Sequence, residues 1–258
     1  MNKTIAALAL PLISNLTSVS FSAALETAAD WRPQITVQVY NAAGVTPSVV
    51  LKAEHEADWI FGKAGIRVNW MSCHFDPESV KAQDCRETAD PLLFVLRINP
   101  GRASAVVSVE ALGFALPFTD NARHGAVNYQ NVEAVYQKNR DLVDLYRLLA
   151  NVMVHELTHL IFESTRHSEG LMHANWSRTD LKRMGKRQLA LTPEQVRQIR
   201  DALIQRASRP RKHSLASSTV HIAHGAYRQV PACVQPSLPC LKLISACRLS
   251  SKRKVDNS

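Results

Sequence analysis

Residues 139–163, NRDLVDLYRLLANVMVHELTHLIFE, constrain the fold more than any other segment, because charged and imidazole groups are set into a long apolar pattern. Leucine, valine and methionine recur at helical spacing between Leu142 and Met153. This spacing predicts one long helix with a face in the core. We expect Asn139 or Asp141 to cap its first turn.

Two histidines and a glutamate lie in the most apolar part of this helix, in the pentapeptide HELTH at 155–159. At about 100° per residue, His155 and His159 lie one turn apart and face the interior together. Burying two imidazoles and the Glu156 carboxylate without partners would cost several kcal/mol. A divalent metal ion removes that cost, and zinc accepts imidazole nitrogen at about 2.0–2.1 Å. The pattern therefore predicts a Zn²⁺ site with His155 and His159 as ligands.

A catalytic zinc ion usually has three protein ligands and one water. His167 is the first candidate for the third ligand, because serine, threonine and glycine between 164 and 170 let the chain turn back toward the metal. His173 is the second candidate. Three carboxylates are further alternatives: Glu169, Asp180 and Glu194. Glu163 has the wrong phase on the helix, and we expect its side chain to face solvent.

Zinc would lower the pKa of a bound water to about 7 and polarise a carbonyl group. Glu156 is not expected to be a ligand, and it is placed to take the proton from that water as a general base. The pattern thus favours hydrolysis by a metal-activated water, with Glu156 as the catalytic residue. A non-catalytic zinc protein of the cell envelope is the alternative hypothesis.

The remaining sequence, with 46% hydrophobic residues, predicts an α+β domain. Strands are expected at 35–41, 65–73, 91–100, 107–118 and 125–136, and helices at 48–65, 139–163 and 191–207. Thr192, Pro193 and Gln195 form a helix-start signature before the last helix. We therefore expect a mixed, twisted sheet packed on the long helix and a second helix, followed by a small C-terminal helical subdomain.

The N-terminus resembles an export signal. Lys3 precedes an apolar run, and Ser22-Ala23-Ala24 suits cleavage after Ala24. We therefore expect residues 1–24 to be a signal peptide and the protein to be secreted or periplasmic, without stable membrane insertion. In an exported chain, Cys73 and Cys85 can form a disulfide across a short polar loop.

The net charge of +9 belongs to the C-terminal tail. Residues 206–258 contain ten Lys or Arg and one acid, Asp256, so the tail carries +9 and residues 1–205 sum to zero. A basic tail can bind nucleic acid or other anionic surfaces. We favour a solvated, disordered extension at 208–258 and expect no nucleic-acid partner.

HELTH followed by His167-Ser168 and then Gly170-Leu171-Met172 resembles the metzincin clan of zinc endopeptidases, and most of all its matrixin branch and similar exported bacterial proteins. The resemblance implies a zincin-like catalytic domain over 25–207, with Met172 in a turn beneath the metal.

It also implies that an edge strand holds an extended peptide or protein substrate, and residues 111–117 are the candidate. We expect a monomer. The clan has a glycine three residues after the second histidine, where this chain has Phe162. The helix is therefore expected to run slightly longer before its turn. No tyrosine lies between Met172 and Gln205 to act as the clan's additional ligand or oxyanion donor.

Overall fold

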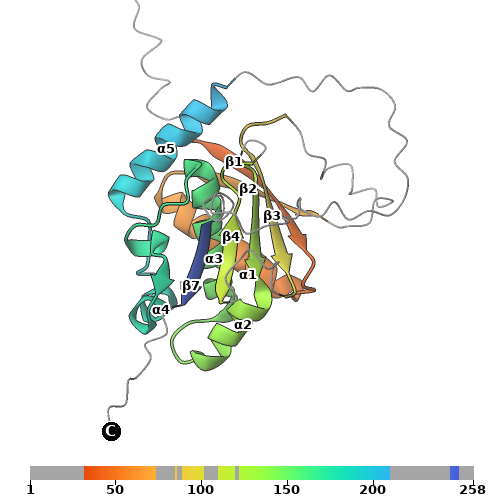
Figure 1. The fold of residues 1–258 in the computed structure, drawn as a ribbon, viewed down its shortest axis with the longest axis vertical. Coiled ribbons are helices and arrows are strands. Elements are labelled where there is room, and N and C mark those ends of the chain that lie inside the picture. Colours follow the sequence, from red (N-terminus) through yellow and green to blue (C-terminus); the bar gives the residue numbers. More distant parts are fainter. Residues whose placement is uncertain are drawn as a thin grey trace, which may run out of the picture. The chain divides into compact units, whose positions relative to one another are not determined.

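A computed structural model of the protein describes residues 32–73, 85, 89–101, 110–119, 122–209 and 245–249. Figure 1 shows the arrangement of these parts as a ribbon. The predicted signal peptide at 1–24 and nearly all of the predicted tail at 208–258 lie outside the described residues. The signal peptide and the domain boundary at 25 therefore stay predictions, whereas the expectation of a disordered tail does not hold at Ser245–Leu249, which form a strand.

Within the described residues, seven strands form one sheet in the order β2-β1-β3-β5-β4-β7-β6. The strands are β1 Gln34–Asn41, β2 Arg67–Cys73, β3 Leu93–Asn99, β4 Ala111–Ala115, β5 His124–Asn128, β6 Asn175–Trp176 and β7 Ser245–Leu249. The first four in sheet order are parallel to one another, whereas β4 runs antiparallel to both of its neighbours, β5 and β7. The mixed sheet that the sequence predicts is therefore present.

The central strand β3 explains why the sheet must be covered. Five of its seven residues, LFVLRIN, are buried, including consecutive positions that point to opposite faces. A strand buried on both faces reads as a continuous apolar run, which is the pattern of residues 93–96. Helices supply much of the cover.

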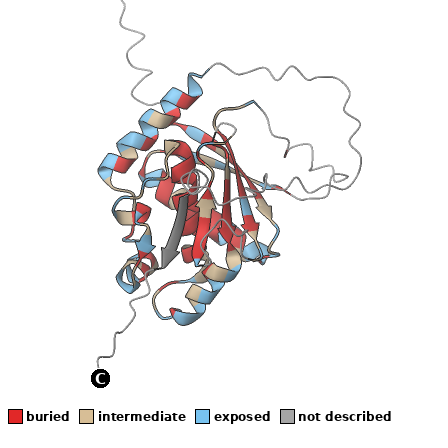
Figure 2. Ribbon diagram, in the orientation of Figure 1, coloured by how far each residue is buried: buried red, intermediate tan, exposed pale blue. Residues whose placement is uncertain are grey.

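The helices are α1 Pro47–Lys63, α2 Tyr129–Lys138, α3 Leu145–Phe162, α4 Arg178–Gly185 and α5 Pro193–Ala207, with a 3₁₀ turn η2 at Gly170–Met172. The central helix is α3, which contacts α1, α2, α4, α5 and strands β4 and β5. Figure 2 shows how burial is distributed over these elements. Because α3 is covered on several sides, all of its residues from Leu148 to Ile161 are buried.

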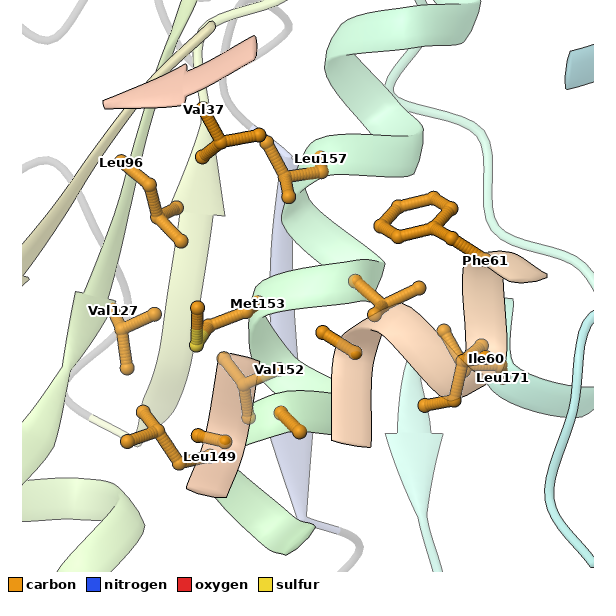
Figure 3. Packing of buried hydrophobic residues seen from close by; sticks show 14 of the residues in the cluster. Val37, Ile60, Phe61, Leu96, Val127, Leu149, Val152, Met153, Leu157 and Leu171 are labelled. Carbon is orange, nitrogen blue, oxygen red and sulfur yellow. The ribbon is translucent and has the colours of Figure 1, made fainter. Parts of the chain in front are cut away.

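The hydrophobic core lies where α3 and α1 meet the sheet (Figure 3). Met153 and Leu157 of α3 pack with Val37 of β1, Leu96 of β3 and Phe61 of α1, and all five are almost inaccessible to solvent. Full burial of one such side chain contributes about 1.5–3 kcal/mol. This core holds α3 rigidly, and with it the polar groups on its C-terminal half.

The strand predicted at 125–136 is wrong beyond Asn128, because residues 129–138 form α2. The valines and tyrosines of YQNVEAVY suggested a strand by composition. However, Tyr129, Val132 and Tyr136 recur at helical spacing, and they pack against the core from one helix face. Tertiary packing therefore overrides the β-propensity of these residues.

The long helix begins at Leu145, later than the predicted start at 139, and neither Asn139 nor Asp141 caps it. Asp144 precedes α3 in an extended conformation without a side-chain capping bond. Gly185, at the end of α4, lies so close to this segment that an added Cβ would be 2.0 Å from the Leu142 carbonyl oxygen. The segment at 139–144 is thus a tightly packed connection from α2 to α3.

The helix-start signature before α5 is confirmed. Thr192 accepts from the amide of Gln195, and the Gln195 side chain accepts from the amide of Thr192. The sequence missed α4, which begins with a second reciprocal cap between Ser177 and Asp180. No helix among the described residues combines the length and the apolar character that a bilayer span requires.

Candidate metal centre

His155, Glu156 and His159 lie on the C-terminal half of α3, and none of the three side chains is exposed to solvent. One helical turn brings the Nε2 atoms of His155 and His159 to 3.0 Å from each other. Their ring centroids are 4.7 Å apart. The helical phase predicted from the sequence is therefore present.

The other ring nitrogen of each histidine faces a backbone carbonyl. The Nδ1 of His155 lies 2.9 Å from the Leu171 oxygen, and the Nδ1 of His159 lies 2.8 Å from the Ser164 oxygen. A carbonyl can only accept, so each Nδ1 carries the proton and each Nε2 carries a lone pair. Two buried lone pairs therefore face each other at 3.0 Å, which is unfavourable unless a cation lies between them.

Burial also keeps these imidazoles neutral. Loss of solvent lowers the pKa of His155 well below its ordinary value, and the neighbouring His159 lowers it further. Burial, together with His167, lowers the pKa of His159 from 6.5 to about 3. Neutral imidazole is the form that binds a metal ion, so both rings are ready to bind without losing a proton from Nε2.

His167 joins this pair from the segment that follows α3. Its ring centroid lies 4.8 Å from that of His159 and 5.3 Å from that of His155. The three histidines each offer a nitrogen, and these nitrogens all lie within 4.8 Å of one another. Three neutral imidazoles converging on one point suit zinc or another transition metal of similar preference.

The return of the chain to His167 depends on Glu163. The helix includes Phe162, the position at which the clan has its glycine, and Glu163 ends it in the left-handed conformation, with φ 50° and ψ 41°. The helix therefore runs slightly longer before its turn, as the sequence predicted. The amide of Ser164 then donates to the carbonyl of His159. Glycine is the usual residue in such a left-handed position, and here Glu163 makes the turn instead.

The prediction for the Glu163 side chain is wrong in part, because its carboxylate is only one-third exposed and accepts from Arg206 at 2.9 Å and from Arg209. Arg206 itself is buried on α5. The ion pairs therefore connect the end of α3 to the last helix.

Helix α5 also fixes the loop that carries His167. The side-chain amide of Gln195 donates to Ser168 Oγ at 2.8 Å and to the Glu169 carbonyl at 2.9 Å. Gln195 is buried, so these two bonds hold the loop from within the protein. The sequence identified Gln195 as a capping residue and did not predict this second contact, since it depends on the packing of α5.

A backbone carbonyl and an indole ring contact the His155 ring on the side of the turn η2. The Leu171 oxygen accepts from His155 and, at 3.2 Å, from the Nε1–H of Trp176. The Trp176 ring meets the His155 ring edge-on, with centroids 5.6 Å apart. Such partners fix the orientation of ligating imidazoles. Sequence reasoning missed both, because neither lies in the HELTH motif.

Glu156 lies against strand β4. A Cβ placed on Gly113 would be 2.8 Å from Glu156 Oε1 and 2.9 Å from its Cγ. Glycine at position 113 is therefore required for β4 to lie this close to the carboxylate. Gly113 is therefore a component of the site that the sequence analysis did not single out.

The alternative third ligands lie apart from the three histidines. His173 is exposed. Asp180 caps α4, while Glu194 is exposed on α5 and bonds Arg197 and Gln198. Glu169 is also exposed. The structure therefore groups His167, and none of these four, with His155 and His159.

Met172 is buried at the end of the turn η2, within the core cluster. Its predicted position beneath the metal stays a prediction. Cys73 and Cys85 form a disulfide, with their Cα atoms 5.8 Å apart. The predicted pairing of these two cysteines is therefore present in the structure.

The expectation that residues 111–117 form a free edge strand is wrong. The strand β4 at 111–115 pairs with β5 on one side and with β7 on the other. This pairing could not be predicted, because β7 lies about 130 residues later in the chain and strand pairing at such separation leaves no local pattern.

No family model matches the chain, and no curated protein matches it. Among solved structures, the chain is similar to the crystal structure of archaemetzincin from Methanopyrus kandleri, with 15% identity and a TM-score of 0.42. That match covers 66% of this chain and 96% of the other. The functional proposal therefore depends on the geometry of the three histidines and Glu156.

Proposed function

We propose that the protein is a zinc-dependent peptidase of zincin-like fold, with metal ligands His155, His159 and His167 and with Glu156 as general base. One observation carries the proposal: the Nε2 atoms of two buried histidines lie 3.0 Å apart, and a third imidazole lies beside them. Zinc would supply a Lewis acid there and lower the pKa of a coordinated water to about 7.

The chain's own residues would perform three tasks. The carbonyls of Leu171 and Ser164 keep the Nδ1 protons in place and so leave Nε2 available to the metal. Glu156, which projects from α3 against Gly113, takes a proton from the attacking water and returns it to the leaving amine. The buried surroundings of the three side chains strengthen these electrostatic interactions.

We propose further that the protein acts as an exported endopeptidase and as a monomer. The apolar N-terminal run and the small residues before position 25 support export. The Cys73–Cys85 disulfide adds support, because disulfides persist in oxidising compartments. The substrate would be a peptide or protein held in an extended conformation.

Metal analysis and peptide hydrolysis, measured on the same preparations, test the proposal. Wild-type protein should contain about one zinc ion per chain. Glu156→Gln should retain that zinc while hydrolysis falls by about 10²–10⁴-fold, since it removes the base and no ligand. His167→Ala should lose zinc readily, whereas His173→Ala, which changes an exposed histidine, should retain it.

Two outcomes would contradict the proposal. Unchanged zinc retention in His167→Ala would exclude His167 as a ligand. Stoichiometric zinc in a wild-type protein that cleaves no peptide in a diverse peptide library would favour the alternative, a non-catalytic zinc protein of the cell envelope.

A further inference from the structure

Strand β7 is inserted between two elements that border the candidate metal centre. It pairs antiparallel with β4, where Gly113 is opposite Cys247 and Ala115 is opposite Ser245. On its other side it pairs in parallel with β6, where Trp176 is opposite Leu249. The dark blue strand in Figure 1 is β7, beside β4 and α3.

Both partners of β7 contact residues of the site. Gly113 of β4 lies against Glu156, because a Cβ added to Gly113 would be 2.8 Å from Glu156 Oε1. Trp176 of β6 lies against the His155 ring. Residues 247–249 therefore run from a position paired with the Glu156 side of the site to a position paired with the His155 side.

This arrangement is that of an extended peptide that adds a strand to β4 and β6. Both partners bind backbone, since strand pairing uses main-chain hydrogen bonds and depends little on sequence. The antiparallel pairing to β4 and the parallel pairing to β6 fix one direction for the bound chain. The ladder to β4 is irregular between Ala111 and Gly113, and the pairing with β6 covers two residues, so the contacts are few.

We propose that Ser245–Leu249 occupies the edge of β4 at which a substrate peptide would add, so that the chain's own C-terminal segment competes with the substrate. The inference rests on the proposed function, because only a peptidase would bind a peptide substrate at this place. The segment is connected to α5 through residues 210–244. Covalent connection makes the pairing intramolecular, with an effective concentration on the order of 1 mM, which is enough to exclude a weakly binding peptide.

The test uses the full-length chain and the variant Ala246→Pro. Proline inside a central strand removes a donor and fixes φ, so β7 should leave both partners. Arg248→Pro is a second variant, because residue 248 pairs with β4 and β6 at once. Lys254→Pro, five residues beyond the strand, is the matched control. Circular dichroism and thermal unfolding verify that each variant is folded.

The probe is a fluorescent nonapeptide, LISASRLSS, which copies residues 243–251 with serine in place of Cys247. Binding is measured by anisotropy on metal-free protein, in which no zinc-dependent turnover occurs. The two strand variants should bind the probe about 10–100-fold more tightly than wild type and Lys254→Pro do. Amides of residues 111–115 should also exchange hydrogen faster in the strand variants.

Equal probe affinity in all four proteins, or unchanged exchange at 111–115, would overturn the inference. So would cleavage of wild-type protein within 245–249 after zinc is added, since the segment would then be a substrate. Tighter probe binding by the strand variants without any peptide hydrolysis in the presence of zinc would support occupation of the β4 edge by Ser245–Leu249 and refute the peptidase proposal.

Discussion

At the scale of single residues, the site depends on one position without a side chain. Gly113 allows β4 to approach Glu156 more closely than any Cβ would permit. A Cβ at this position would also lie 2.9 Å from the Ala126 carbonyl oxygen of the neighbouring strand. A methyl group there has no space to enter, so either the carboxylate or the strand must move. Gly113 is therefore a positioning residue for Glu156.

We predict that Gly113→Ala lowers kcat/KM for peptide hydrolysis at least about tenfold, because displacing a general base by a fraction of an ångström weakens proton transfer. Zinc content should not change, since no ligand is touched. Gly125→Ala in β5 is the control: its Cβ would meet nothing closer than 3.5 Å. Full activity in a folded Gly113→Ala protein would refute this role.

At the scale of secondary-structure elements, the end of α3 decides whether the third histidine reaches the site. The left-handed turn at Glu163 reverses the chain, and the ion pair with buried Arg206 connects this turn to α5. The same helix positions the loop at 168–169 through Gln195. Helix α5 thus controls the site although it contributes no proposed ligand.

We predict that Glu163→Gly is more stable than Glu163→Ala by about 1 kcal/mol, because only glycine adopts the left-handed conformation without strain. Both variants should be less stable than wild type, since each leaves Arg206 without its carboxylate. Urea unfolding of the three proteins provides the measurement. Equal stability of the two variants would show that the turn relaxes when the ion pair is lost.

At the scale of the whole molecule, stability depends on ionisable groups that folding buries. Glu54 lies on α1 with 7% of its surface exposed, and its Oε1 has no hydrogen-bond partner among the described residues. Burial, with a contribution from the negative charge of Asp58, raises the pKa of Glu54 from 4.5 to about 7. Folding therefore keeps a proton on this carboxyl between pH 4.5 and 7, and stability falls as the pH rises through that range.

We predict that Glu54→Gln increases the free energy of unfolding at pH 8 by about 1–2 kcal/mol relative to its effect at pH 5, after allowance for partial solvent screening. At pH 5 the wild-type carboxyl is still protonated when folded, so the substitution changes little. Urea unfolding at the two pH values measures the difference. Glu133→Gln, on the exposed face of α2, should give the same small effect at both pH values; a matching result for Glu54→Gln would contradict the prediction.

The amino-acid sequence by itself determined those features that depend on local spacing. The helical period placed His155 and His159 on one side of α3, and the Thr192 and Gln195 pattern gave the start of α5. The short spacing between Cys73 and Cys85 indicated their disulfide. Each depends on residues a few positions apart, or on one short loop, whose geometry is nearly fixed by the chain.

Tertiary structure alone decided the remaining features. Residues 129–138 form a helix because one face packs on the core, against their β-propensity. His167 meets the other histidines because α5 stabilises a left-handed turn at Glu163 and anchors the following loop. Strand β7 pairs with β4 across some 130 residues. Contacts between distant segments depend on the packing of the whole domain, and they leave no periodic signal in the sequence of either partner.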